Sequence, residues 1–331
     1  MVCLLGFAQA KPSYTQYVLN NYILNPAVVG IENYTDVKFS NRNQWTGIDG
    51  APVTSYFSIH GPIGKTDLRT SATSMPVKGV NPRGKDYWKD YTAPEAHHGI
   101  GMTIMNDKAG YLNRWSFYAS YAYHKPLSNK TTLSAGLNAG ISSVYLDRDK
   151  VDFAGTDPND EAIGFATGEL KKVKPELGAG LWLYSDKYFA GLSVLNIIPG
   201  KASFVKNDKY GVSYSINYFL TAGYRVLLND DWNFIPSVMV QYWKPQLTGV
   251  HFNTKLQYTD LIWLGASYRY SNLVGGYSAM LGLNVANINV SYSYEVATTS
   301  RLRTYTGNTH EIMIGFLFGN KYGDSCPRNV W

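Results

Sequence analysis

The sequence is poor in charge and contains no long apolar run. Only 16% of its 331 residues are Asp, Glu, Lys or Arg, whereas about 25% is usual for a soluble domain. No segment approaches the roughly 20 consecutive apolar residues that a membrane-spanning helix needs, and the mean hydropathy is −0.22. A helical membrane protein is therefore excluded, and the low charge argues against an ordinary soluble protein.

Cysteine is also scarce, with two in the chain, Cys3 and Cys326. Cys3 lies in a short apolar segment that ends in Ala-Gln-Ala at 8–10, a pattern typical of signal-peptide cleavage. We predict a signal peptide over residues 1–10, and its missing positive n-region fits a true start codon further upstream. A lipoprotein anchor at Cys3 is the alternative, although Val2 stands where a small residue is expected. Cleavage leaves Cys326 alone, so the mature chain can form no internal disulfide.

Motifs for chemistry are missing as well. The sequence has no Gly-rich phosphate loop, HExxH or CxxC. The adjacent His97 and His98 would point to opposite faces of a strand, which makes them a poor joint metal site. A Ser-His dyad in a barrel wall is the enzymatic alternative, but no pairing can be chosen from sequence. The Asp residues within 147–160 resemble a loose calcium loop that lacks its Gly and Glu, and a solvated acidic loop is the simpler interpretation.

We therefore predict that the protein is not an enzyme and uses no metal or cofactor. The net charge is +6, with a pI near 9.0. Because the Lys and Arg residues are scattered and form no basic block, we also predict no nucleic-acid partner.

The chain is rich in tyrosine and glycine, with 27 Tyr and 31 Gly, and in segments where apolar and polar residues alternate. The stretch 287–294 reads NINVSYSY, and alternation at period two places successive side chains on opposite faces of a strand. Half of such a strand would face lipid and half a polar lumen, as in a transmembrane barrel. A soluble all-β protein is the alternative. The predicted lipid face is Ile288, Val290, Tyr292 and Tyr294, and the predicted lumen face is Asn287, Asn289, Ser291 and Ser293.

From residue 34 onward, segments of this kind alternate with clusters of Gly, Asn, Asp and Pro. We predict an all-β fold, a transmembrane antiparallel β-barrel of outer-membrane type with fourteen strands in residues 34–320. Closure is needed because an open sheet edge would leave unpaired backbone groups in lipid. The predicted strands are 34–43, 52–61, 97–106, 111–124, 131–146, 175–185, 187–195, 213–226, 231–244, 250–260, 261–271, 275–285, 287–298 and 308–318.

Aromatic residues gather near the ends of these strands. Barrels carry Tyr and Trp at both membrane interfaces, and we interpret these residues as such girdles, with ordinary core aromatics as the alternative. The predicted girdle residues are Tyr111, Trp115, Tyr123, Tyr145, Trp182, Tyr188, Tyr224, Trp232, Trp243, Tyr268 and Tyr270.

The connections suggest an orientation. If both termini are periplasmic, the segments 44–51, 147–174, 196–212 and 299–307 lie outside the cell, and the short turns lie inside. The 62–96 connection breaks this rule, because it is long and would be periplasmic. It is rich in Lys, Arg, Pro and aromatic residues. We hypothesise a docking surface for a periplasmic partner; a wrongly phased topology and a disordered loop are the alternatives.

Two motifs stand out in the N-terminal third, one over 16–30 (QY, then NPA, then Gly) and RNQWTGIDGAP over 42–52. Together they resemble the PorP/SprF family of type IX secretion system membrane proteins from Bacteroidetes. Shorter likenesses extend this resemblance over nearly the whole mature chain. The chain departs from the family at Val28-Val29, where Tyr or Phe is frequent. The residues that carry the resemblance are Gln16, Tyr17, Asn25, Pro26, Gly30, Arg42, Gln44, Trp45, Gly47, Gly50, Ala51 and Pro52.

The resemblance implies an outer-membrane barrel that assists secretion or surface attachment of specific cargo, such as gliding adhesins, through protein–protein contacts. It also implies the periplasmic lipoprotein ring, the cargo and outer-membrane lipids as partners. An outer-membrane channel for small solutes or lipids is the alternative function. The motif residues are structural or partner-binding candidates.

The first motif also has a physical interpretation. Asn25-Pro26 forms turns readily, so residues 11–33 would make an N-terminal segment that either plugs the barrel or sits at its periplasmic mouth. Arg42 would face the lumen, because a charge on the lipid face costs roughly 2–4 kcal/mol at the midplane. Trp45 would anchor an external loop at the headgroup level. Residues 321–331 would form a C-terminal tail.

Overall fold

The computed structural model describes residues 15–65, 92–146, 171–198, 200–202, 212–243, 247–259, 261–271, 275–285, 287–298 and 307–319. The predicted signal peptide, the acidic segment 147–160, residues 66–91 of the long connection and the predicted tail lie outside these ranges. No helix in the described residues is long and apolar enough to cross a membrane.

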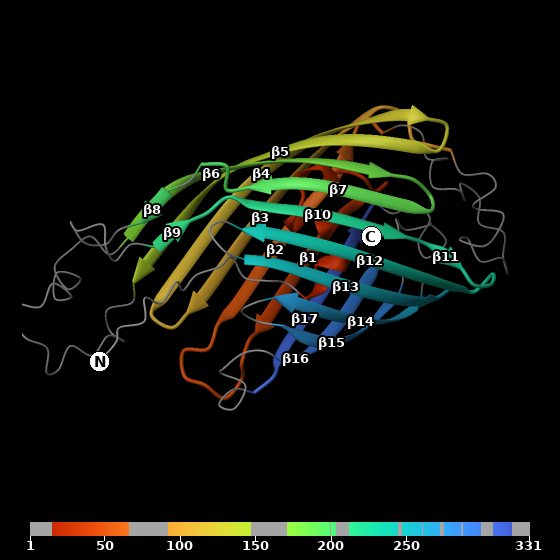
Figure 1. Cartoon of the computed structure of the whole chain (residues 1–331). Coiled ribbons are helices and arrows are strands. Elements are labelled where there is room, and N and C mark those ends of the chain that lie inside the picture. Colours follow the sequence, from red (N-terminus) through yellow and green to blue (C-terminus); the bar gives the residue numbers. More distant parts are fainter. Residues whose placement is uncertain are drawn as a thin grey trace, which may run out of the picture.

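The described strands form one closed antiparallel barrel (Figure 1). Neighbours in sequence pair with each other, and the ring closes where the first strand pairs with the last. Fourteen strands make this ring in the described ranges, which confirms the predicted fold and its strand order. They are β1 (Thr35–Asn43), β2 (Val53–Ile63), β3 (His97–Ala109), β4 (Leu112–Ser128), β5 (Thr131–Leu146), β6 (Lys171–Tyr184), β7 (Tyr188–Leu195), β10 (Asn217–Tyr224), β12 (Trp232–Trp243), β13 (Leu247–Tyr258), β14 (Ile262–Ser271), β15 (Gly276–Val285), β16 (Ile288–Ala297) and β17 (Thr309–Phe318).

The predicted strand 213–226 is divided in the structure. Its beginning belongs to β9 (Val212–Tyr214), which pairs with β8 (Gly200–Ala202) in a separate two-stranded sheet. Its end is β11 (Val226–Leu227), which continues β10 along β12. Arg225 separates β10 from β11, since its backbone N–H donates to the carbonyl oxygen of Lys187 at 2.6 Å. The predicted strand 213–226 therefore contributes residues to two different sheets, the two-stranded sheet and the barrel.

The barrel has two different ends. We call the end that carries residues 44–52 the loop end, and the opposite end, which carries residues 129–130, the turn end. Figure 1 shows β8 and β9 at the loop end. The described flanks of the long connection lie at the turn end, where the N–H of Ala93 donates to the carbonyl oxygen of Asn129 at 2.7 Å. The long connection therefore begins and ends at the same end of the barrel as the 129–130 turn, as the predicted topology required.

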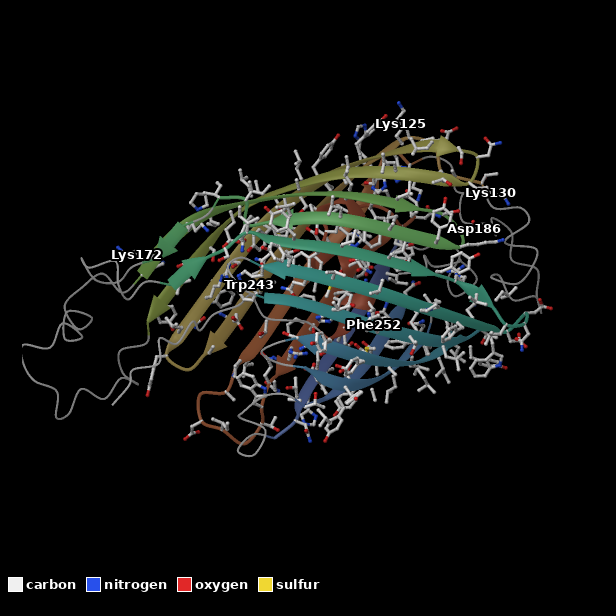
Figure 2. All side chains as sticks on the ribbon, in the orientation of Figure 1. Lys125, Lys130, Lys172, Asp186, Trp243 and Phe252 are labelled. Carbon is white, nitrogen blue, oxygen red and sulfur yellow. The ribbon has the colours of Figure 1, made fainter. Side chains whose placement is uncertain are left out.

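The outer wall is apolar, as a lipid-facing surface requires. Figure 2 shows the side chains on this wall, with Phe252 labelled, and Lys125 and Lys130 at the turn end. The predicted alternation is confirmed within β16, where Ile288 and Val290 are exposed whereas Ser291 and Ser293 are buried. Asn287, predicted to face the lumen, lies in the turn before this strand and is exposed. Eight of the predicted girdle residues are exposed on this surface: Tyr111, Trp115, Tyr123, Tyr145, Tyr188, Tyr224, Tyr268 and Tyr270.

One girdle prediction is wrong. Trp182 is fully buried and stacks on Phe189, with 5.3 Å between ring centroids. Its neighbour Leu181 faces outward and is 46% exposed. The segment Leu181-Trp182-Leu183 is apolar on both faces, so alternation could not tell which side chain points to the lipid.

Residues 15–34, which precede β1, lie inside the barrel. They form three short 3-10 helices, η1 (Gln16–Leu19), η2 (Asn21–Ile23) and η3 (Pro26–Val28). Their apolar side chains pack against inward-facing residues of the wall in two buried clusters. Tyr22 and Ala27 belong to the first cluster and Tyr17 and Leu24 to the second. We call residues 15–34 the lumen segment, because this stretch supplies the core of the barrel.

Candidate functional site

Asn25-Pro26-Ala27 of the lumen segment lies against glycines of the wall. A side chain at Gly136 of β5 would overlap the backbone of Pro26 and Ala27. A side chain at Gly180 of β6 would overlap the Asn25 side chain. Glycine at these positions lets the backbone of the motif approach the sheet closely. The contact explains why the segment docks on this part of the wall.

Hydrogen bonds fix Asn25 in place. Its Oδ1 accepts from the N–H of Ala27 at 3.0 Å, which caps η3 in the manner of an N-cap residue. Its Nδ2 donates to the carbonyl oxygens of Leu181 and Leu192, at 3.0 and 3.3 Å. Ser193 and Ser134 donate to the carbonyl oxygens of Leu24 and Ala27 at 2.6 and 2.7 Å. One side chain thus holds its own helix and two strands together.

Gly30 makes the next contact, towards the turn end. It adopts φ of 77°, a region that favours glycine, and a Cβ there would overlap Gly99 of β3. Its N–H donates to Nδ1 of His60 at 3.3 Å. His124, whose ring stacks on His97, contacts the carbonyl oxygen of Val29 through Nε2 at 2.8 Å. The end of the lumen segment is therefore surrounded by buried histidines that act as hydrogen-bond partners.

A buried ionic cluster lies near the loop end. Arg42 faces the lumen, and its Nη2 and Nη1 lie 3.1 and 3.2 Å from carboxylate oxygens of Glu295 and Glu311. Arg269 donates to both oxygens of Glu295, at 3.0 and 3.3 Å. All four side chains are less than 10% exposed. Two positive and two negative groups compensate one another, as burial of charge requires.

The cluster binds the start of the lumen segment. The N–H of Thr15 donates to Glu311 at 3.0 Å, and its hydroxyl donates to Glu295 at 2.5 Å. Gln16 Nε2 donates to the carbonyl oxygen of Glu311 at 2.6 Å, and Gln16 Oε1 accepts from Ser291. The chain therefore runs along the lumen, from these contacts near the loop end to Gly30 near the turn end.

Tyr17 and Tyr22 sit in the middle of this path. The Tyr17 hydroxyl accepts from Nδ2 of Asn253 at 2.5 Å, and the Tyr22 hydroxyl donates to Ser120 at 3.0 Å. Burial disfavours the phenolate and raises the pKa of both tyrosines above the usual value. They act as neutral packing groups with satisfied hydroxyls at physiological pH.

The second motif forms the rim of the loop end beyond Arg42. Gln44 and Pro52 face each other, with the N–H of Gln44 donating to the Pro52 carbonyl oxygen at 2.9 Å. Thr46 exchanges backbone hydrogen bonds with Asn308 and Gly307 at 3.2 and 2.7 Å. On the other side, Gly110 donates to Gly50 at 2.8 Å. Three neighbouring connections are thus joined into one surface.

Trp45 is unusual within this rim. Its φ is 51°, a left-handed conformation that costs a bulky residue about 1–2 kcal/mol. Gly47 and Gly50 adopt φ of 96° and 75°, where glycine bears no such cost. Ala51 is half-buried beside Gly50, and its N–H donates to the carbonyl oxygen of Ile48 at 3.2 Å. Strain of this kind persists where the surrounding contacts over-determine the backbone.

The structure brings the two motifs together at one point only. Gln16 and Arg42 meet at Glu311, whereas Asn25 and Gly30 lie towards the turn end and Trp45 lies on the rim. Sequence reasoning missed Glu295 as a partner. An acidic residue at an inward position of an alternating strand was the available signal. In the described residues, no group of three His, Cys, Asp or Glu is placed to hold a metal ion.

These features define an outer-membrane β-barrel with its own N-terminal segment packed in the lumen. The model of the family "Type IX secretion system membrane protein PorP/SprF" matches residues 6–316. The chain therefore belongs to the PorP/SprF family, which confirms the resemblance found in the sequence. A search of curated proteins gave no match.

Solved outer-membrane proteins have a similar overall structure. Omp33 of Acinetobacter baumannii is 9% identical, with 87% of this chain and 100% of that chain covered and a TM-score of 0.46. The toluene transporter TbuX of Ralstonia pickettii is 12% identical, with 91% and 92% covered and a TM-score of 0.48. A deletion mutant of the monoaromatic hydrocarbon channel TodX is 11% identical, with 93% and 95% covered and a TM-score of 0.47. Identities this low carry no information on function.

Proposed function

We propose that the protein is a non-enzymatic accessory of type IX secretion, which assists secretion or surface attachment of specific cargo proteins by binding them. Membership of the PorP/SprF family supports the link to type IX secretion. The observation that supports action by binding, not by transport, is the position of the lumen segment. This segment packs against the inner wall through two apolar clusters and a buried ionic cluster. A filled barrel offers partners its two ends rather than a passage.

The two ends fit different partners. The rim at the loop end is held by hydrogen bonds between three connections, and it presents Trp45 and Asp49 on a fixed backbone. A preorganised surface loses less entropy on binding than a mobile one. We assign cargo, such as a gliding adhesin, to this rim. The turn end, predicted to face the periplasm, is assigned to the periplasmic lipoprotein ring, and outer-membrane lipids surround the apolar wall.

The competing function is a channel for small solutes or lipids. A channel needs a continuous path, and the lumen segment occupies the position of that path. The channel therefore requires that residues 15–34 leave the barrel. Loss of their buried hydrogen bonds to the wall, including those of Thr15 to Glu295 and Glu311, would oppose this step.

Deletion of the gene, followed by proteomics of the cell surface and the medium, tests the proposal. We expect particular surface proteins to be retained inside or released, and a plasmid copy to restore them. Loss of solute uptake with unchanged surface proteins would favour the channel instead. A pull-down from outer membranes with mass spectrometry should recover cargo together with periplasmic lipoproteins.

A further inference from the structure

The wall of the barrel is uneven at the loop end, where β6 extends beyond its neighbour β7. On one side β6 pairs with β5 from Tyr184 to Lys171. On the other side its pairing with β7 begins only at Gly178, because β7 ends at Leu195. Within the described ranges, residues 171–177 of β6 therefore have a partner strand on one side only. We call this stretch the β6 strip.

The chain after β7 turns away from the β6 strip. Asn196 adopts φ of 59°, a left-handed conformation. The N–H of Ile197 still donates to the carbonyl oxygen of Leu177 at 2.9 Å. The next strand, β8, pairs with β9 in the separate two-stranded sheet and does not continue along β6. The β6 strip is thereby left with an open edge.

The backbone groups that face this open edge can be identified. Alternate residues of an antiparallel strand direct their N–H and C=O groups to the same neighbour. Since the carbonyl of Leu177 faces the side of β7, the backbone groups of Lys171, Val173 and Pro175 face the same side. Pro175 suits this position, because it has no N–H group to leave unpaired. No backbone hydrogen bond between described residues uses the N–H of Val173 on that side.

The β6 strip lies near the surface of the membrane. Lys171 pairs with Tyr145, one of the exposed girdle residues. Val173 is 60% exposed on the outer face, whereas Lys172 and Lys174 point inward and are half-buried. An open strand edge is a template for pairing with another chain, and unpaired backbone groups are costly in lipid. The open edge is therefore both reachable from the loop end and suited to an added strand.

The β6 strip is also positively charged. It contains three lysines and one acidic residue, Glu176, whose carboxylate lies 2.6 Å from Nη2 of Arg114. Lys172 and Lys174 have contacts of their own, so the strip favours acidic partners through its net charge. Lysine and proline on an edge discourage pairing with ordinary strands. Together these features select for an acidic strand over a neutral one.

We propose that an extended segment of a partner protein adds to the open edge of β6 as a further strand. In this segment acidic side chains alternate with apolar ones. The acidic side chains lie on the inner face with Lys172 and Lys174, and the apolar ones lie beside Val173 on the outer face. Main-chain hydrogen bonds supply the affinity of such an added strand, and its side chains supply specificity. The inference rests on the proposed function for the identity of the partner, which is the cargo assigned to the loop end.

Fluorescence anisotropy with the purified full-length protein in detergent tests this edge. The probe is a labelled heptapeptide of alternating Glu and Val with blocked ends. We expect saturable binding, and binding at least about ten-fold weaker when Lys replaces Glu in the peptide. Two analogues carry N-methyl groups, one on every Val amide and the other on every Glu amide. Only one of them should lose binding, because alternate N–H groups of a strand face the same neighbour.

Val173→Pro locates the effect on the protein. This substitution removes the N–H group that faces the open edge and leaves the ladder between β5 and β6 intact. The barrel should therefore fold, and its affinity for the Glu-Val peptide should fall at least about ten-fold. The matched control is Val173→Thr, which keeps the N–H group and should keep the affinity. If Val173→Pro does not fold, the two methylated analogues on the wild-type protein decide.

Absence of binding, equal binding of the two methylated analogues, or unchanged affinity in Val173→Pro would overturn the proposal. So would complete disulfide formation in the double variant Val173→Cys/Gly200→Cys, because it would show that β8 itself covers the edge. Gly200 would stand opposite Val173 if β7 continued in register. Peptide binding is measured on the purified protein, so its failure would leave the result of the gene deletion, and the proposed function, unaffected.

Discussion

Arg42 and Glu311 form an ion pair across the seam where β1 meets β17, with 3.2 Å between Nη1 and Oε2. Their side chains are 1% and 0% exposed. The same carboxylate accepts from the backbone of Thr15. One buried pair therefore joins the first strand, the last strand and the lumen segment, so closure of the barrel and filling of its lumen depend on each other.

Glu311→Gln should strongly destabilise the barrel, because it leaves a buried positive charge uncompensated. We expect the free energy of unfolding to fall by about 3–5 kcal/mol, measured by urea unfolding in detergent. In the double variant Arg42→Gln/Glu311→Gln the loss should be smaller than the sum of the single losses, since the two residues are coupled. Additive losses would contradict the pairing.

Close contact at Gly99 gives a second prediction. A methyl group there would overlap the carbonyl of Val29, so Gly99→Ala should displace the lumen segment and cost about 1–3 kcal/mol. Gly249→Ala is the matched control, because its Cβ would meet its nearest atom at 3.7 Å. We expect that control to stay within about 0.5 kcal/mol of wild type. Equal effects in the two variants would show that Gly99 does not touch the segment.

The buried tyrosines predict an alkaline loss of stability. The pKa of Tyr17 and of Tyr22 is raised in the folded state by burial. Their contribution is therefore complete below the unfolded pKa of about 10 and declines as the pH rises above it. The double variant Tyr17→Phe/Tyr22→Phe should therefore lose less of its free energy of unfolding than wild type between about pH 9 and about pH 11. Urea unfolding at a series of pH values measures this. Parallel decline in the two proteins would contradict burial of these hydroxyls.

Trp45 tests whether the rim is functional. Trp45→Gly relieves a left-handed backbone strain of about 1–2 kcal/mol, so the barrel should fold with unchanged or higher stability. We expect it nevertheless to reduce the amount of cargo at the cell surface, measured by surface proteomics against wild type. The control is Tyr188→Ala, which changes an exposed girdle residue at the turn end, away from the rim. A Trp45→Gly strain with normal surface cargo would remove Trp45 from the proposed cargo site.

The strands were predictable from sequence because their two faces meet different surroundings. In 288–294 the polar and apolar positions separate cleanly, and the structure follows them. Alternation failed at Trp182, where both faces are apolar and the lumen segment provides a second core. Alternation also predicted one continuous strand over 213–226, whereas a backbone hydrogen bond from Arg225 to Lys187 interrupts it. A backbone hydrogen bond of this kind does not alter the order of polar and apolar residues, so the sequence could not show it.

The candidate site was predictable only in part. The family resemblance pointed to Gln16, Asn25 and Arg42, and the charge of Arg42 also predicted that it faces the lumen. Their partners were not predictable, because Glu295 and Glu311 lie more than 250 residues along the chain from Arg42. A single sequence contains no signal for which inward-facing residues meet across the lumen. Gly136 and Gly180, against which Asn25-Pro26-Ala27 packs, cannot be distinguished in the sequence from other strand glycines.

Conductance of the purified protein in planar lipid bilayers tests the central claim most directly, namely that residues 15–34 fill the barrel. The account predicts no stable conductance steps for the wild-type protein, and their appearance in Glu311→Gln if the lumen segment is released. Steady wild-type conductance of the size of an open porin would contradict a filled lumen and favour the channel function.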